Sequence, residues 1–228
     1  IQLDLIEMTK GTFMEKDPMM LVSAEKKHGI DDLKDVLLKE CNEAPEKYDR
    51  GIFRQNVDRV FSIKGYGTVI TGTVISGNLN VGEKIEIIPG GIITKVRSLQ
   101  SHGKNVNTVN LGDRAAINLQ GIEKTDIKRG YQLATPGFFK SVSQIGAIIN
   151  VLNSAKKSIF QNQRIRIHFG TQEGMARLAL INNKEIEPGN ECSALIRFEN
   201  PMVASIGDKF IIRSYSPMIT IGGGLVLD

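Results

Sequence analysis

Thr68-Val-Ile-Thr-Gly-Thr-Val-Ile75 is a run of mainly β-branched residues, and it follows a glycine-containing stretch, Gly65-Tyr-Gly67. Strands favour β-branched residues, and glycine supplies the tight turns that join antiparallel strands. Similar runs follow at Lys84–Ile88, Ile92–Leu99 and Arg114–Leu119. This pattern predicts a small β-barrel over residues 51–137.

A second set of strand-like runs indicates another all-β domain over residues 138–228. Its runs are Val142–Leu152, Gln163–Phe169, Gly174–Ile181, Glu191–Phe198 and Phe210–Tyr215. Turn signals at Pro188-Gly189, Pro201 and Pro217 separate them, and Thr135-Pro-Gly137 is the expected joint between the two barrels.

Residues 1–50 have a different pattern. Ile1–Lys10 is expected to be helical, Met19–Ala24 to form a short strand, and Ile30–Cys41 to form a helix with apolar residues at helical spacing. The polar stretch from Cys41 to Gly51 contains Pro45 and is interpreted as a linker. The predicted fold class is therefore mainly β, with two consecutive small β-barrels preceded by an α/β segment.

Composition excludes several classes of protein. Hydrophobic residues are 41% and charged residues 24% of the chain, as in ordinary globular domains. Apolar runs such as Ile145–Leu152 are too short for a bilayer, so neither a membrane span nor a signal peptide is predicted. Cys41 and Cys192 lie far apart without a CxxC pair, which favours a reducing, cytoplasmic setting.

No catalytic or metal-binding motif is found. His28, His102 and His168 are isolated, without ligands at metal-binding spacing, and no G-x-S-x-G nucleophile motif occurs. Gly65-Tyr-Gly67 lacks the third glycine and the following helix of a dinucleotide-binding fingerprint, so it is interpreted as a hairpin turn.

The charge is distributed unevenly along the chain. Residues 1–50 carry 8 basic and 12 acidic residues, residues 51–137 carry 11 and 6, and residues 138–228 carry 10 and 7. The net charges of these parts are therefore −4, +5 and +3. A basic surplus on the two β-domains is compatible with a polyanionic partner, although many solvated surfaces carry a similar surplus.

Longer motifs carry a family resemblance. Phe53-Arg-Gln-Asn-Val-Asp-Arg-Val-Phe61, Lys64–Thr73, Leu119-Gln-Gly-Ile122 and Asp126-Ile-Lys-Arg-Gly130 resemble the second domain of translational GTPases of the elongation factor Tu type. Ser98–Lys104, His168-Phe-Gly-Thr171, Gly207–Arg213 and Thr220–Gly224 resemble more specifically the bacterial selenocysteine-specific elongation factors.

The resemblance implies a GTPase domain ahead of two tRNA-binding barrels. Val22-Ser-Ala24 resembles the last guanine-contacting motif of that domain, so Ser23 and Ala24 are its expected remnant. No G-x-x-x-x-G-K-[ST] phosphate loop is present, so this stretch is not expected to be an enzyme or to hold a cofactor. The parent protein is expected to use GTP and magnesium, to bind selenocysteinyl-tRNA and the ribosome, and to read an mRNA hairpin through domains beyond Asp228.

The resemblance also assigns binding residues in the first barrel. Asp58-Arg59 stands where elongation factor Tu has two acids facing the aminoacyl end of tRNA, and Arg114 is the second expected member of a cationic selenocysteine pocket. Arg59 shares strand parity with Val57 and Phe61, so it is expected on an otherwise apolar side, with Asp58 on the other face. A salt bridge at the barrel rim is the alternative for Arg59, and a solvated polar face is the alternative for Arg114.

Further along the chain, Arg129 matches a position that meets the 5′ phosphate of tRNA. Weaker candidates for the tRNA arm are Arg164, Arg166, His168 and Arg213. Two alternative functions remain. The barrels belong either to a general elongation or initiation factor that carries ordinary aminoacyl-tRNA, or to a structural, protein-binding β-module.

Overall fold

The computed structural model describes residues 1–12, 14–45 and 49–228, and it divides into two compact units, Ile1–Tyr48 and Asp49–Asp228. In the described part of the first unit, the regular elements are α1 (Gln2–Thr9) and α2 (Ile30–Glu43). Both helices agree with the sequence prediction. However, α2 extends to Glu43, so the first residues of the predicted linker are helical, and linker residues 46–48 lie outside the described residues.

The strand predicted over Met19–Ala24 is not formed. Ser23 and His28 make an isolated antiparallel bridge, with their backbone amides and carbonyls 3.0 and 3.1 Å apart. A strand needs a neighbouring strand for its backbone groups, and within residues 1–12 and 14–45 none lies beside this segment. The turn that carries Ser23 and Ala24 is thus held by this bridge and by the bond from the Lys26 amide to Ser23 Oγ.

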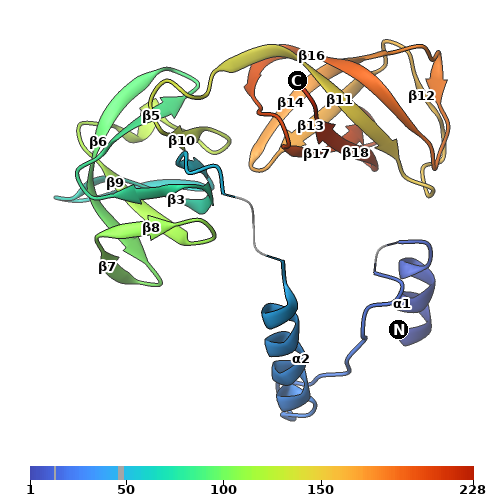
Figure 1. Cartoon of the computed structure of the whole chain (residues 1–228), viewed down its shortest axis with the longest axis horizontal. Helices are drawn as coiled ribbons and strands as arrows, with labels where there is room; N and C mark the ends of the chain where they lie inside the picture. Colours follow the sequence, from blue (N-terminus) through green and yellow to red (C-terminus); the bar gives the residue numbers. More distant parts are fainter. Residues whose placement is uncertain (13, 46–48) are drawn as a thin grey trace. The chain divides into compact units, whose positions relative to one another are not determined.

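The first barrel occupies the green part of Figure 1. Its elements are β1 (Arg54–Asn56), β2 (Arg59–Ile63), β3 (Gly67–Ser76), β4 (Asn78–Asn80), β5 (Lys84–Ile88), β6 (Ile92–Ser101), β7 (Lys104–Val106), β8 (Thr108–Asn110), β9 (Arg114–Leu119), the short 3-10 helix η1 (Lys124–Asp126) and β10 (Gln132–Ala134). Within the uninterrupted range 49–228, six of these strands close a ring in the order β1-β10-β5-β6-β9-β3, and β2 pairs with the first half of β3.

Alternation along these strands builds the core of the first barrel. Ile70, Ile85, Leu99, Ile117 and Leu133 are fully buried, while the intervening side chains point outward. The glycine-containing turn after β2 has Gly65 and Gly67 at φ +84° and +90°, conformations that other residues rarely adopt. The hairpin predicted from Gly65-Tyr-Gly67 is therefore confirmed.

The second barrel runs from yellow to red in Figure 1. Its strands are β11 (Ser141–Val151), β12 (Ile159–Phe160), β13 (Arg164–Phe169), β14 (Gln172–Leu180), β15 (Glu185–Ile186), β16 (Glu191–Val203), β17 (Lys209–Ser214) and β18 (Thr220–Val226). Six of them form a closed barrel in the order β11-β16-β14-β13-β17-β18. The mainly β fold with two consecutive barrels is as predicted.

Two features of the second barrel differ from the sequence prediction. Pro201 does not end its strand, because β16 continues to Val203 past a register irregularity opposite Val142 and Gln144. The glycine-rich β18 was not predicted, although it pairs with both β11 and β17. Its three glycines lie so close to neighbouring backbone that no Cβ fits there.

Candidate nucleic-acid interface

Asp58, Arg59 and Arg114 gather on the outer surface of the first barrel. Arg59 opens β2 and lies opposite Thr71 of β3, while Arg114 opens β9 and lies opposite Thr73 of the same strand. Since Thr71 and Thr73 are two residues apart, both arginines belong to one face of the sheet. The structure therefore brings together the three residues that the resemblance assigns to one pocket.

Asp58 lies just before β2, and its carboxylate accepts a hydrogen bond from Arg114 at 2.5 Å. This hydrogen bond, together with the positive charges of Arg114, Arg59 and Arg129, holds the pKa of Asp58 below its ordinary value. Asp58 is thus ionised at neutral pH, and its negative charge interacts with the guanidinium groups of Arg114, Arg59 and Arg129. The expectation that Asp58 faces away from the cations is wrong, because its position before the strand lets the carboxylate reach across to Arg114.

The surroundings of Arg59 also differ from the expectation. Val60, not Arg59, faces the core opposite Ile70, so the side that Arg59 shares with Phe61 is the exposed outer face. Arg59 is exposed there and forms no ion pair with any described residue of the chain. The salt bridge found at this rim belongs to Arg114 instead.

A hollow of about 330 Å³ lies on the same outer face. Its lining includes Phe61, Ile63, Tyr66, Val69, Gln100 and Asn118. Asn118 is only 4% exposed, and its Nδ2 donates to the Tyr66 carbonyl at 2.7 Å while its Oδ1 has no partner in the described structure. A buried acceptor without a partner is costly, so the Asn118 amide is an unusual group in the wall of the hollow. Sequence reasoning missed this hollow, since its residues come from five separate strands.

Arg129 lies in the turn between η1 and β10 and is exposed. It lines a hollow of about 230 Å³ together with Lys128 and Tyr131 of the first barrel and Gln172 and Glu173 of the second. Beside it, Thr171 Oγ1 donates to the Val57 carbonyl at 2.7 Å and so joins the two barrels. Arg129 thus stands where both barrels meet, next to a pocket large enough for a phosphate group.

Three of the four weak candidates in the second barrel gather around Glu173. Arg166 pairs with the Glu173 carboxylate, and His168 Nδ1 lies 4.0 Å from it, while Arg213 lies opposite Arg166 across β13 and β17. The Arg166 hydrogen bond lowers the pKa of Glu173, and burial lowers the pKa of His168 despite the nearby carboxylate. His168 is therefore neutral at neutral pH.

Arg164 belongs to a different group. Its Nε and Nη2 donate to the two oxygens of Glu199 at 2.7 Å each, and its guanidinium lies 4.6 Å from the centre of the Tyr215 ring. Sequence reasoning missed Glu173, Glu199 and Tyr215 as partners of these cations. The alternation along each strand predicts which face of the sheet a side chain lies on. Only the pairing of β13 with its neighbouring strands shows which side chains on that face contact the arginines.

Ser23 and Ala24 lie in the first unit, which is described separately from the barrels. Ser23 Oγ accepts from the Lys26 amide at 3.2 Å. Among the described residues, no cluster of His, Cys, Asp or Glu suits a metal ion. None of the described helices is both long and apolar enough to span a membrane.

Comparisons with known proteins agree with this architecture. The family model described as elongation factor Tu domain 2 matches residues 67–134, and that of the selenocysteine-specific elongation factor β-barrel domain matches residues 147–228. The selenocysteine-specific elongation factor of Desulfomicrobium baculatum is 36% identical over 218 residues, covering 96% of this chain and 34% of that protein. Its counterpart from Haemophilus influenzae is 30% identical, covering 95% and 34%.

A solved structure supports the same relationship. The crystal structure of translation elongation factor SelB from Methanococcus maripaludis in its apo form superposes with a TM-score of 0.86 and 25% identity, covering all of this chain and 54% of that one. The chain spans about a third of the length of the two bacterial relatives it matches. Both barrels match this family in sequence and in fold, and the chain therefore belongs to the selenocysteine-specific elongation factors.

Proposed function

We propose that this chain supplies the barrels with which a selenocysteine-specific elongation factor holds the aminoacyl end of selenocysteinyl-tRNA. The observation that carries the proposal is the group of Asp58, Arg59 and Arg114 beside a hollow that contains an unsatisfied buried acceptor. An anion-binding group and a base-sized hollow on one face suit the end of a charged tRNA, where an amino acid follows a terminal nucleotide.

Arg59 is the proposed selector of selenocysteine. A selenol is more acidic than a thiol or a hydroxyl, so selenocysteine is an anion near neutral pH, whereas serine on the same tRNA is neutral. A difference of one small group in a pocket discriminates by only about 1 to 3 kcal/mol, so charge is the better criterion. Since Asp58 already neutralises Arg114, Arg59 offers the free positive charge.

The hollow beside it is proposed to take the terminal base of the tRNA. Phe61, Ile63 and Tyr66 give apolar and aromatic surface on which a base stacks, and Asn118 and Gln100 give the hollow polar side chains for the base edge. Arg129 is proposed to bind the 5′ phosphate, because a guanidinium contacts phosphate with two parallel hydrogen bonds. Arg164, Arg166, His168 and Arg213 are proposed to meet the arm of the tRNA.

The organisation of the whole protein is part of the proposal. Residues 1–50 are the end of the GTPase domain of the parent protein, residues 51–137 are its second domain and residues 138–228 are its third domain. Ser23-Ala24 is the guanine-base motif of the GTPase domain. The parent is a cytoplasmic GTPase that uses GTP and magnesium, delivers its tRNA to the ribosome and reads an mRNA hairpin with further domains. This stretch alone lacks a phosphate loop and is not an enzyme, so a fluorescent guanine nucleotide should not bind it at micromolar concentration.

The central experiment compares selenocysteinyl-tRNA with seryl-tRNA on the same tRNA body. Arg59→Ala should weaken the binding of selenocysteinyl-tRNA and leave the binding of seryl-tRNA nearly unchanged. Arg114→Ala should have a smaller effect of the same kind. Lys84→Ala, an exposed lysine on β5, is the matched control. Undiminished discrimination in the Arg59→Ala, Arg114→Ala double variant would contradict the charge mechanism, whereas equal binding of the two tRNAs by the parent chain would favour a general factor.

Arg129→Ala separates phosphate binding from amino-acid selection. Its proposed partner is common to every tRNA, so the variant should lose affinity equally for both charged tRNAs and lower the salt slope by about one counterion. A change in amino-acid preference would contradict the assignment.

A further inference from the structure

Val57 and Asp58 form the two-residue connection between β1 and β2, directly before Arg59. The Val57 side chain is fully buried in the core of the first barrel, and its amide donates to the Tyr131 carbonyl at 2.8 Å. The Asp58 amide donates to the Thr71 carbonyl, also at 2.8 Å. Backbone hydrogen bonds within the first barrel therefore hold both amides of this connection.

The carbonyl of Val57, in contrast, is held from both barrels. It accepts one hydrogen bond from the Gly130 amide of the first barrel at 3.1 Å and another from Thr171 Oγ1 of the second barrel at 2.7 Å. Thr171 lies in the turn between β13 and β14 and is partly buried. A carbonyl oxygen has two lone pairs, so these two donors satisfy it. A side chain of the second barrel thus fixes the backbone one residue before Asp58.

The residue before this connection, Asn56, lies close to glycines of both barrels. In the first barrel, a Cβ on Gly72 of β3 would lie 2.0 Å from the Asn56 carbonyl oxygen. In the second barrel, a Cβ on Gly170 would lie 2.3 Å from Asn56 Nδ2. Gly170 precedes Thr171 and has a φ of +53°, which side chains rarely adopt. The turn that carries Thr171 is therefore packed directly against the chain that leads to Asp58.

The position of Asp58 decides which arginine of the proposed aminoacyl pocket is free. Its carboxylate is hydrogen-bonded to Arg114 at 2.5 Å. Arg59, the next residue, forms no ion pair with any residue that the structure describes. Both arginines belong to one face of the sheet, so a small shift of the carboxylate brings it from one to the other. A carboxylate shared with Arg59 would neutralise the charge that is proposed to recognise the selenolate.

We infer that Thr171 is a positioning residue for amino-acid selection: its hydroxyl holds the Val57 carbonyl so that Asp58 pairs with Arg114 and leaves Arg59 free. The choice of amino acid on the first barrel is thereby set in part from the second barrel. In this role Thr171 acts through Asp58 and does not itself touch the amino acid. The inference rests on the proposed function, because it takes Arg59 as the selector. One hydrogen bond contributes a factor of about three to ten to an equilibrium constant, which sets the size of the effect.

Two substitutions of Thr171 separate its hydroxyl from its shape. Thr171→Val removes the hydroxyl and keeps the branched shape, whereas Thr171→Ser keeps the hydroxyl. In equilibrium binding, Thr171→Val should lower the ratio of the affinities for selenocysteinyl-tRNA and seryl-tRNA about threefold to tenfold, and Thr171→Ser should retain the ratio of the parent chain. Thr220→Val, at an exposed threonine of β18, is the matched control.

The affinity ratio distinguishes positioning from a purely structural role. A hydroxyl that only joined the two barrels would, when removed, weaken both tRNAs by the same factor. An unchanged ratio in Thr171→Val, measured on a parent chain that discriminates, would therefore overturn the inference.

A second readout needs no tRNA. Protons of a guanidinium group that is hydrogen-bonded to a carboxylate exchange with water more slowly than those of a free one. In NMR spectra of the whole chain, the Arg114 guanidinium should exchange more slowly than that of Arg59, both in the parent and in Thr171→Ser. In Thr171→Val the difference should shrink, because Asp58 then divides between the two arginines. An unchanged difference in Thr171→Val would also overturn the inference.

The two readouts separate this inference from the proposed function. If the parent chain binds both tRNAs alike while Thr171→Val still alters the guanidinium exchange, amino-acid selection by Arg59 fails and the positioning of Asp58 stands. If the parent chain discriminates and Thr171→Val changes neither the affinity ratio nor the exchange, the positioning role fails alone.

Discussion

Asp58 shows how much one side chain decides at the scale of single residues. Its carboxylate lies against Arg114 and within electrostatic range of Arg59 and Arg129, so it sets how much positive charge the outer face offers. Because its pKa is lowered, its contribution to stability is present above the unfolded value near 3.8 and is lost only as the pH falls below that value. The Asp58–Arg114 pair therefore stays formed throughout the neutral and mildly acidic range.

This gives a pH prediction for binding. If Arg59 recognises the selenolate anion, the preference for selenocysteinyl-tRNA should shrink as the pH falls and the selenol becomes protonated, while seryl-tRNA binding stays flat. Asp58 is still ionised over that range and so does not itself cause the change. The test is to measure the equilibrium affinities of both tRNAs from slightly alkaline to mildly acidic pH. A ratio of the two affinities that stays constant with pH would contradict recognition by charge.

His168 gives a second residue-scale prediction. Burial places its pKa below the ordinary value of about 6.5, so the unfolded chain binds the proton more strongly and stability decreases as the pH falls through that value. His168→Gln should therefore flatten the fall in melting temperature between about pH 7.5 and about pH 5.5. His102→Asn, in an exposed turn at positive φ that asparagine tolerates, is the matched control. Equal slopes for His168→Gln and the parent chain would contradict the prediction.

At the scale of the elements, β18 shows why a strand can be built around glycines. A Cβ on Gly224 would lie 2.0 Å from the Ile148 carbonyl oxygen and 2.6 Å from the Phe210 ring. Phe210 in turn packs against Phe169, with ring centres 5.5 Å apart, so the ring has little room to move. The close approach of β11 and β17 on either side of β18 thus requires glycine, against its low strand propensity.

Gly224→Ala should destabilise the second barrel by about 1 to 3 kcal/mol or more, because the added methyl overpacks a closed barrel. Gly146→Ala on β11 is the matched control, since its nearest neighbour is Asp228 Cβ at an ordinary 3.6 Å. Urea unfolding midpoints compare the two. Similar midpoints for both variants would show that β18 has more freedom than the structure indicates.

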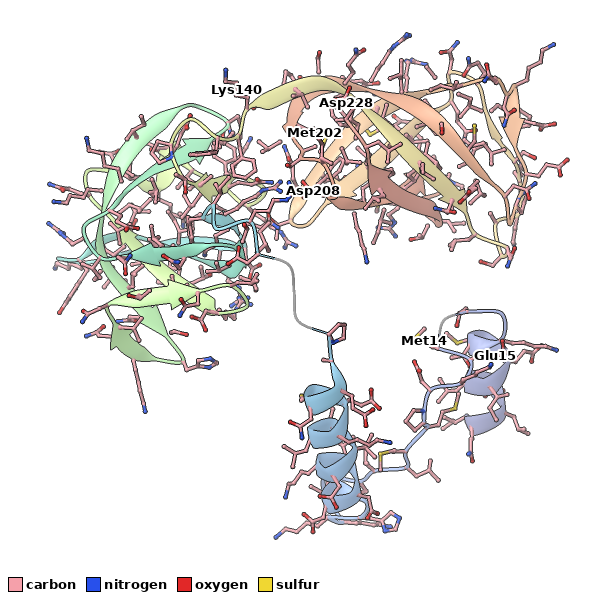
Figure 2. The ribbon with its side chains drawn as sticks, in the orientation of Figure 1. Met14, Glu15, Lys140, Met202, Asp208 and Asp228 are labelled. Carbon is pink, nitrogen blue, oxygen red and sulfur yellow. The ribbon has the colours of Figure 1, made fainter. Side chains whose placement is uncertain are left out.

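At the scale of the molecule, the two barrels of residues 49–228 are joined by a buried ion pair. Arg54 in β1 is 5% exposed; its Nη1 and Nη2 donate to Asp208, labelled in Figure 2, at 2.7 Å each, and its Nε donates to Gln132 at 2.7 Å. A small apolar cluster, Ile88, Ala134 and Val203, lies at the same joint. These contacts couple the barrel that carries the proposed aminoacyl pocket to the second barrel.

Asp208→Asn should lower the free energy of unfolding by about 3 to 5 kcal/mol, because it leaves the buried Arg54 charge without its counterion. We expect calorimetry to show one unfolding transition for the parent chain over residues 49–228 and two for the variant, as the barrels uncouple. Glu199→Gln breaks the solvent-exposed Arg164 pair and should leave the unfolding temperature nearly unchanged, because water screens exposed ion pairs. A single transition at nearly the parent temperature in Asp208→Asn would argue against coupling through this pair.

The sequence by itself determined the parts of the fold that depend on local patterns. β-branched runs with period two predicted β3, β5, β6 and β9 to within two residues, because alternation and glycine turns need no distant partner to be recognised. The family motifs likewise placed Asp58, Arg59 and Arg114 in one group. Local patterns could not show the strand of glycines, the continuation of β16 through Pro201, or short strands such as β4 and β12.

Only the tertiary structure decided which charges are free. Asp58 and Arg114 are 56 residues apart, and Arg164 and Glu199 are 35 apart, so each pair forms only when barrel closure brings its strands together. The same closure assembles the hollow around Asn118 and aligns Arg164, Arg177 and Arg197 in one row. Parity along a strand gives the face of a side chain, but the register between strands determines its neighbours, and electrostatics depends on those neighbours.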